Sequence, residues 1–347
     1  MLEKFMIKKN LHLFFVALFI FFFVLAFPLA WWDWQGRWHA GERTLLYAIR
    51  MWLYWAQFSM LPLLLALMTS PWGKKNRRQR SVKTIFCIGL VCGIWAEQIE
   101  PHLLQVRYTT IQTGKSAAQP KPQTVKIALI SDIHWGFFGR DWQLQRVIDR
   151  IATLDIDAVF IAGDWTYEPK LDLETGFAPL KQLTVPIFGV LGNHDLEKPG
   201  PRVADELLKA LVANNVQFVE KKTISWKGWQ IIGLNDLWGG HPRDEIEPLF
   251  HQPASNRLVL THQPDTFSLL PDNAMQVGLA GHSHGGQVYI PFATEWQLEK
   301  SIKLGWYNGL YQTPHGQVFV TPGIGMTNLP FRFAVPPTID VLTIQVP

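Results

Sequence analysis

The feature that most constrains how this chain folds is a pattern repeated through its C-terminal two-thirds: short apolar runs that each end in Asp, Asn or His. The runs are rich in Val, Ile and Leu and too short for helices, so they predict buried β-strands. Helix-like stretches at residues 142–154 and roughly 175–183 separate the first three runs, which favours an α/β fold whose sheet begins largely parallel. The runs are residues 125–130, 158–162, 187–191, 258–260 and 277–280.

The polar residues that end these runs form a set of metal-ligand types. Because the carboxyl ends of parallel strands meet at one edge of a sheet, we expect these side chains to gather there. Carboxylate and amide oxygens mixed with imidazoles suit Mn, Fe, Zn, Ni or Co. The set is too large for one tetrahedral ion but suffices for two divalent metal ions if one carboxylate bridges them. The candidate ligands are Asp132, His134, Asp164, Asn193, His262, His282 and His284.

Taken in order, these motifs resemble the calcineurin-like binuclear metallophosphoesterases, whose pattern is D-x-H, G-D, G-N-H-D, a lone His and G-H-x-H. The resemblance covers residues 126–347 and implies a sandwich of two mixed β-sheets flanked by helices. Residues 261–265, 285–287 and 321–332 resemble the membrane-anchored branch, which includes some UDP-2,3-diacylglucosamine pyrophosphatases of lipid A synthesis. The matching blocks are Asp132/His134, Gly163-Asp164, Gly192-Asn193-His194-Asp195, His262 and Gly281-His282-Ser283-His284.

The same resemblance implies a role for each residue. Asp164 would bridge the two metals. His194 would stabilise the transition state or protonate the leaving oxygen, and Asp195 would position it, while a metal-activated hydroxide attacks phosphorus in line. One metal would take Asp132, His134 and His284, and the other Asn193, His262 and His282.

The residues beside the motifs leave some readings open. Aromatic side chains flank the first two ligand loops. They are interpreted either as ordinary packing or as a wall for an amphiphilic substrate. They are Trp135, Phe137, Phe138, Trp165 and Tyr167. His241 is a candidate to face the site. Arg140, Arg202 and Arg332 could hold a second phosphate, although a surface ion pair is the commoner role for any one of them.

One alternative catalytic reading is a serine hydrolase, because Gly281 to Gly285 also satisfies G-x-S-x-G. That motif requires a helix directly after it. Residues 286–291 instead read as a strand, and His315 is the only later histidine that could serve as a base. The pattern therefore favours the metal site.

The N-terminal third predicts membrane helices. Residues 13–32 contain no charged side chain, and twenty residues of helix match a hydrocarbon core of about 30 Å. Residues 48–68 form a second candidate span. A third, residues 84–100, reaches spanning length only by including Glu97 and Glu100. We therefore expect residues 1–104 to form a membrane region of two or three helices, followed by a linker over residues 105–124 and a catalytic domain over residues 125–347.

Lys and Arg in short loops indicate the cytoplasmic side of the membrane. Residues 74–83 carry six of them and no acid, and Lys4, Lys8 and Lys9 lie near the N-terminus. Both features predict a cytoplasmic N-terminus, and the basic loop also suits membrane lipids with anionic headgroups. A third span would make the catalytic domain extracytoplasmic, whereas an interfacial helix would keep it cytoplasmic.

The charge balance argues against nucleic acid as a partner. Residues 1–123 hold 15 Lys and Arg against 5 Asp and Glu, so the remaining residues hold 17 against 23 and are net acidic. Phosphate-backbone binding needs clustered cations, so the net acidity of the C-terminal part disfavours such a surface. The chain's two cysteines, Cys87 and Cys92, both lie in an apolar stretch, which excludes a disulfide framework in the catalytic part.

Together these features predict a membrane-anchored phosphohydrolase acting on a lipid-linked or envelope phosphoester. UDP-2,3-diacylglucosamine pyrophosphatase activity is the alternative if the domain is cytoplasmic. A non-catalytic membrane sensor that binds a phosphorylated ligand is the alternative from another class.

Overall fold

The computed structural model describes residues 2–34, 44–74, 76–114, 123–169, 172–196, 203–250 and 256–346. The chain divides into two compact units. The first contains the N-terminal helices together with Asn328–Phe333, and the second contains His102–Thr327 and the C-terminal strand. The second unit therefore begins near residue 102, earlier than the predicted boundary at residue 125.

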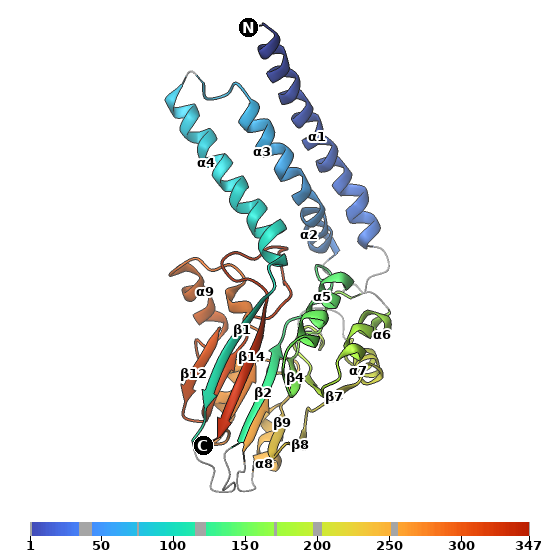
Figure 1. The fold of residues 1–347 in the computed structure, drawn as a ribbon, viewed down its shortest axis with the longest axis vertical. Helices are drawn as coiled ribbons and strands as arrows, with labels where there is room; N and C mark the ends of the chain where they lie inside the picture. Colours follow the sequence, from blue (N-terminus) through green and yellow to red (C-terminus); the bar gives the residue numbers. More distant parts are fainter. Residues whose placement is uncertain are drawn as a thin grey trace. The chain divides into compact units, whose positions relative to one another are not determined.

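The first unit is a helical bundle in which α1 packs against α2 and α3, and α3 against α4 (Figure 1). Pro62 interrupts the regular helix between α2 and α3, because its nitrogen has no N–H to donate to a carbonyl of the preceding turn. The chain there forms a 3-10 turn, η2 (Gln57–Ser59), and the Gln98 side chain donates to the carbonyl of Gln57 at 2.8 Å. The helices are α1 (Leu2–Trp34), α2 (Thr44–Ala56), α3 (Met60–Thr69) and α4 (Arg77–Ile94).

Three helical segments of this unit are long and apolar enough to cross a membrane, judged by length and composition: Met6–Asp33, Ala48–Thr69 and Arg77–His102. The third is longer than the predicted residues 84–100. It begins at Arg77 and α4 continues without interruption into the π-helical turn η3 (Trp95–Ile99) and the 3-10 turn η4 (Glu100–His102).

The prediction of a linker over residues 105–124 is wrong for the first half of that segment. Residues 105–112 form strand β1 (Gln105–Gln112), which pairs in parallel with β14 (Thr338–Val346) at the edge of a sheet. Strand β2 (Gln123–Ile130) already begins before the predicted domain boundary. Residues 115–122 lie outside the described residues.

Two mixed six-stranded sheets form the second unit, as the family resemblance implied. The first has the order β1-β14-β2-β4-β6-β7, and the second has the order β12-β13-β11-β10-β9-β8. Strands not yet given are β3 (Trp135–Gly136), β4 (Ala158–Ala162), β5 (Thr166–Tyr167), β6 (Ile187–Val190), β7 (Val216–Phe218), β8 (Lys222–Trp226), β9 (Trp229–Gly233), β10 (Arg257–Leu260), β11 (Val277–Ala280), β12 (Gly309–Thr313) and β13 (Gly316–Val320).

The sheets pack face to face through alternating side chains. On β2, Ile127 and Leu129 point into the core between the sheets, where they share a cluster with Leu258 of β10. Ala128 and Ile130 point the other way, into the core under the outer helices. A third cluster covers the far face of the second sheet. Every β2 side chain in these cores is shielded from water, which explains the apolar run.

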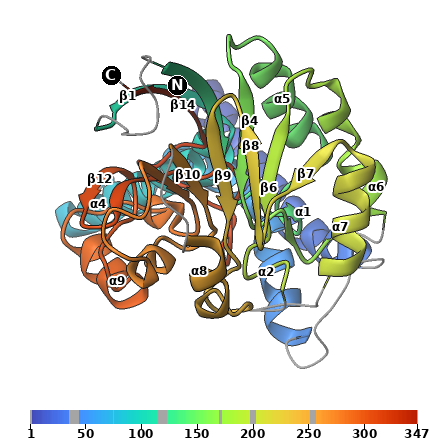
Figure 2. The same cartoon turned by 90° about the horizontal axis from the view of Figure 1, so that it is seen from below.

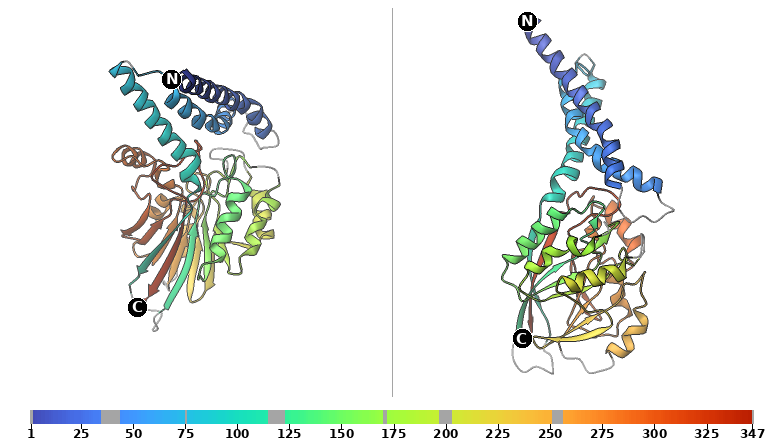
Figure 3. Two further views of the ribbon diagram at one scale, coloured as in Figure 1. Left: turned by 45° about the horizontal axis from the view of Figure 1, so that its top comes forward. Right: turned by 90° about the vertical axis from the view of Figure 1, so that its right-hand side faces the viewer.

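Helices cover the outer faces of both sheets (Figures 2 and 3). The predicted helix at residues 142–154 is confirmed as α5. The one at 175–183 is reduced to a short α6 and a 3-10 turn, η5 (Ala178–Gln182), which contains Pro179. The helices are α5 (Asp141–Ala152), α6 (Leu173–Gly176), α7 (Ala204–Ala213), α8 (Arg243–Phe250) and α9 (Ala293–Ser301), and the remaining 3-10 turns are η6 (Pro264–Leu269) and η7 (His284–Gly286).

Candidate metal centre

All seven candidate ligands lie in loops at the carboxyl ends of parallel strands, and the fold brings them into one cluster. Three loops come from the first sheet, after β2, β4 and β6. Two come from the second sheet, after β10 and β11. Face-to-face packing of the sheets therefore joins residues that are up to 152 positions apart, from Asp132 to His284.

One group of ligand atoms surrounds Asp132. His134 Nε2 and His284 Nε2 are 3.0 Å apart, and His284 Nε2 lies 3.4 Å from Asp132 Oδ1. Asp132 Oδ1 is buried and accepts no hydrogen bond from the described residues. A buried carboxylate oxygen facing two imidazole nitrogens suits a bound cation, because it needs a positive partner in place of water.

A second group surrounds Asn193. Its Oδ1 lies 3.1 Å from His262 Nε2 and 3.0 Å from His282 Nδ1, and these two nitrogens are 3.2 Å apart. His262 Nδ1 lies 2.7 Å from the carbonyl of Ala162, which can accept its proton. That hydrogen bond directs Nε2 into the group, as a metal-bound histidine requires.

Asp164 lies between the two groups. Its Oδ2 is 3.6 Å from His134 Nε2 in the first group and 3.2 Å from His262 Nε2 in the second. Its Oδ1 accepts a hydrogen bond from the backbone N–H of His194 at 2.9 Å. One oxygen is thus available to both groups, which is the arrangement that a bridging ligand needs. The residues fit a pair of divalent ions.

The electrostatics of the cluster favour positive charge. Burial lowers the pKa of both His134 and His282 to about 3, so both rings are neutral and can offer lone pairs. Burial opposes charge on His262 as well, but Asp164 and the neighbouring carboxylates outweigh it and raise its pKa to about 10. Burial raises the pKa of Asp132 to about 6. The carboxylates therefore attract whatever cation is present, a proton or a metal.

The ligand loops hold an unusual backbone conformation. Five of the seven candidate ligands have positive φ, between 49° and 70°, a region that costs a non-glycine residue about 1–3 kcal/mol. Gly192 allows the loops to approach, because a Cβ there would lie 2.1 Å from Asp164 Oδ1. Strain of this kind is typical of functional sites. The residues concerned are Asp132, His134, Asp164, His282 and His284.

His194 is half-buried, as is the candidate ligand His282, whereas the rings of His134 and His262 are fully buried. Its ring packs edge-to-face against His134, with centroids 4.9 Å apart, and against Tyr167 at 4.8 Å. It also lies close enough to His134 and Asp164 to share a cation with them. A histidine at the accessible side of the cluster can meet a substrate.

Asp195 is fully buried and fastens two ligand loops together. Its carboxylate accepts hydrogen bonds from the backbone N–H groups of Gly192, Trp165 and Thr166 and from the Thr166 hydroxyl, at 2.8–3.2 Å. These contacts hold the backbone on either side of His194. Asp195 therefore acts on the loop that carries His194.

Sequence reasoning missed two residues next to the cluster. Asp236 is buried just after β9 and accepts hydrogen bonds from the backbone N–H groups of Trp238 and Gly239. That turn presents the half-exposed Trp238 ring to His282, edge-to-face at 4.7 Å. The signal was available, because Asn235-Asp236 also follows an apolar run, at residues 231–234.

Of the two readings of the aromatic residues beside the ligand loops, ordinary packing is confirmed in the described structure, because their rings are buried in the fold. Trp165 is fully buried and donates to the carbonyl of Val190, and Trp135 donates to Asp141. Phe137 and Phe138 pack on Tyr167. Of this set, Tyr167 contacts the site histidines.

The other candidate side chains differ in where the structure places them. His241 is exposed. Arg332 is fully buried and belongs to the first unit, so the expectation of a surface ion pair is wrong there. Arg140 precedes α5, and Arg202 lies outside the described residues.

The serine-hydrolase alternative fails on geometry. The Ser283 hydroxyl donates to the carbonyl of Tyr307, and a single 3-10 turn, His284–Gly286, follows it where the motif requires a helix. His315 instead lies beside Pro271. The segment after Gly286 is not the predicted strand either, and it forms a loop before α9.

Comparisons with known proteins agree with this geometry. The calcineurin-like phosphoesterase profile matches residues 125–286. An uncharacterized metallophosphoesterase of Bacillus subtilis, YkuE, is 30% identical over 261 residues, covering 72% of this chain and 89% of the relative. The UDP-2,3-diacylglucosamine pyrophosphatase LpxG of Chlamydia trachomatis is 23% identical, covering 76% of this chain and 95% of its own length.

A transmembrane protein with a metallophosphoesterase domain from Danio rerio is 27% identical, covering 60% of this chain and 51% of the relative. The chain thus spans about half the length of that relative. The match to the bacterial relative, the family profile and the order of ligand blocks all point the same way. The chain belongs to the calcineurin-like metallophosphoesterase family of phosphoester hydrolases.

Proposed function

We propose that this protein is a metal-dependent phosphohydrolase anchored in the cytoplasmic membrane, and that it cleaves a phosphodiester, phosphomonoester or pyrophosphate of a lipid-linked or envelope substrate. The observation that carries the proposal is that Asp164 is shared by two groups of ligand side chains, with the half-buried His194 beside them. The seven candidate ligands and His194 all match the residue types of the family pattern, so each can still bind a metal or move a proton.

Each side chain has a distinct task in the proposed reaction. Two divalent ions, when bound, supply a nucleophilic hydroxide near neutral pH and neutralise charge on the phosphoryl group. His194 stabilises the transition state or protonates the leaving oxygen. Asp195 is a positioning residue that holds the loop of His194, and the hydrogen bond from His262 to Ala162 keeps that imidazole in its ligand tautomer.

We propose an extracytoplasmic position for the catalytic domain. The beginning of α1 and the turn between α3 and α4 lie at the same end of the helical unit (Figure 1), and both are basic. Basic short segments favour the cytoplasm. Three crossings would then carry the chain after His102 to the opposite side. Such a domain would meet envelope phosphoesters.

A second candidate is UDP-2,3-diacylglucosamine pyrophosphatase activity, which the similarity to the chlamydial relative favours. A nucleotide-linked lipid made in the cytoplasm requires a cytoplasmic domain. A C-terminal reporter that is active in one compartment separates the two. An external reporter signal supports the envelope substrate, and a cytoplasmic signal contradicts the three-span arrangement and makes UDP-2,3-diacylglucosamine the substrate to assay.

Catalysis itself is tested on the purified full-length protein with Mn²⁺ and a generic aryl phosphodiester. We expect turnover that a chelator abolishes and added metal restores. Absence of turnover with both metals bound would contradict the proposal and support a sensor that binds a phosphorylated ligand.

A further inference from the structure

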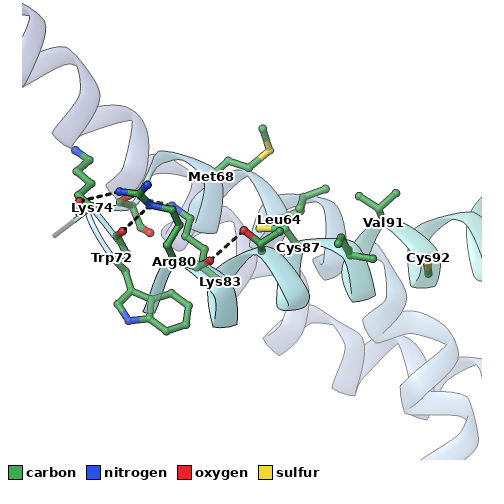
Figure 4. A pocket seen from close by; sticks show the side chains of 13 residues that line it. Leu64, Met68, Trp72, Lys74, Arg80, Lys83, Cys87, Val91 and Cys92 are labelled. Carbon is green, nitrogen blue, oxygen red and sulfur yellow. Dashed lines mark hydrogen bonds between the residues drawn. The ribbon is translucent and has the colours of Figure 1, made fainter. Parts of the chain in front are cut away.

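An open groove of about 700 Å³ lies between α3, α4 and the turn that joins them (Figure 4). Its walls are largely apolar, with Leu64 and Met68 from α3 facing Cys87, Ile88 and Val91 from α4. Ile88, Val91 and Met68 are more than half exposed. A volume of this size is typical of sites for small molecules, which range over about 300–1,000 Å³.

Positive charge gathers at one end of the groove, where Lys74, Arg80 and Lys83 line it (Figure 4). Arg80 Nε and Nη2 lie 3.5 and 3.3 Å from the carbonyls of Gly73 and Lys74, and Lys83 Nζ lies 3.2 Å from the carbonyl of Ser70. These contacts direct both cationic groups over the end of the groove. An anion seated there would meet a guanidinium and an ammonium together.

Among the side chains that the structure describes, no carboxylate pairs with the cations at this end. Residues 43–96 contain neither Asp nor Glu. Within the described parts of the chain, Arg80 and Lys83 have no carboxylate partner, and their contacts are with uncharged carbonyls. The ligand that complements the groove therefore carries negative charge at one end and an apolar chain at the other.

The length of the groove matches one leaflet of a bilayer. From Arg80 to Val91 the helix rises eleven residues, or about 16 Å at 1.5 Å per residue. Half of a hydrocarbon core of about 30 Å is about 15 Å. An acyl chain that begins beside the cations would thus reach the middle of the membrane along α4.

We propose that this groove binds one anionic glycerophospholipid, with its phosphate beside Arg80 and Lys83 and one acyl chain along Leu64, Ile88 and Val91. The lipid fills the space between α3 and α4 at the end of the helical unit that carries the basic turn. The site rests on the membrane anchoring proposed above and is independent of phosphoester hydrolysis. A zwitterionic lipid is a poorer ligand because its own ammonium group repels the cations.

The test is native mass spectrometry of the detergent-solubilised full-length protein, titrated with dioleoyl phosphatidylglycerol or dioleoyl phosphatidylcholine. We expect one phosphatidylglycerol to be retained in preference to phosphatidylcholine. The double variant Arg80→Gln/Lys83→Gln should weaken its binding about 30-fold, because each cation near the surface contributes about fivefold. Equal retention of the two lipids would overturn the proposal.

A charge-matched control separates the groove from general surface attraction. Arg77→Gln/Arg78→Gln removes the same charge from the beginning of α4, but neither residue lines the groove. We expect this pair to retain phosphatidylglycerol within about twofold of the unaltered protein at 0.15 M salt, where surface attraction is screened. Equal weakening by both pairs would overturn the proposal.

A steric pair tests the acyl-chain position without altering charge. Val91→Trp should block the groove and abolish retention, whereas Phe86→Trp, at an exposed residue outside the lining, should not. Inorganic phosphate should fail to compete, and competition would mean that the end binds free anions. Turnover of an aryl phosphodiester is measured in parallel. A protein that binds the lipid but does not hydrolyse the phosphodiester would contradict the proposed function, and the proposed lipid site would stand.

Discussion

His194→Ala provides the sharpest test of the division of labour in the metal centre. The backbone N–H of residue 194, which hydrogen-bonds Asp164 at 2.9 Å, survives the substitution, and the seven candidate ligands are untouched. We therefore expect both metals to remain bound. Loss of a positioned proton donor should lower turnover at least about 100-fold, or about 2.7 kcal/mol in the barrier.

The assay combines metal content with turnover on two substrates. A phosphodiester with an alkyl leaving group needs the proton more than one with a nitrophenolate leaving group, so the loss should be larger for the alkyl substrate. His241→Ala is the matched control, because that histidine is exposed and belongs to none of the metal-binding groups among the described residues. Metal loss that parallels the loss of turnover would refute the assignment and make residue 194 a ligand, consistent with its proximity to His134 and Asp164.

Three further perturbations address the framework of the site. Asp195→Asn replaces an oxygen that accepts two hydrogen bonds, which should cost about 3 kcal/mol and lower the melting temperature by about 6–12 °C at pH 8. Burial raises the Asp195 pKa to about 7, so the carboxylate predominates at that pH, and an unchanged melting temperature would contradict its fastening role. Gly192→Ala would place a Cβ 2.1 Å from Asp164 Oδ1 and should weaken metal affinity at least about tenfold by titration, whereas Gly114→Ala meets no atom within 4 Å and should not. Chelation should abolish hydrolysis and lower the melting temperature measured by scanning fluorimetry, because a ligand at a thousandfold excess over Kd stabilises the folded state by about 4 kcal/mol; a metal-free protein that melts at the same temperature would contradict this.

The ligand loops could be predicted because each is local in sequence. An apolar run long enough for a strand, followed at once by Asp, Asn or His, indicates both the strand and the edge at which its polar residue lies. The predicted runs correspond to β2, β4, β6, β10 and β11, and the loops that follow these strands contain every candidate ligand. Asp236 follows the same rule after β9, and it was missed because its loop lacks a family motif.

Strand β1 could not be predicted because its stability is not local. Its side chains are mostly part-exposed, and polar residues such as Arg107, Thr109 and Thr110 interrupt the apolar pattern. What holds it in the sheet is parallel pairing with β14, more than two hundred residues away, and an ion pair from Arg107 to Asp340. Neither contact leaves a recognisable pattern in the sequence of the strand itself. The proline-containing segment that follows β1 therefore led to the prediction of a linker.

The positive φ angles of the ligand residues could not be predicted from the sequence either. The hydrogen bonds that hold them run between different ligand loops, which explains why the motif works as a unit. Asp132 and His134 are both left-handed, and each donates its backbone N–H at 3.0 Å to the loop after β4, at Gly163 and Asp164. His282 is left-handed too, and its N–H donates to Asp132 Oδ2. Each of these three strained residues is thus held by another ligand loop. The unfavourable conformation is stabilised only when all the loops are present, so a single block moved to another sheet would relax and lose its ligand geometry.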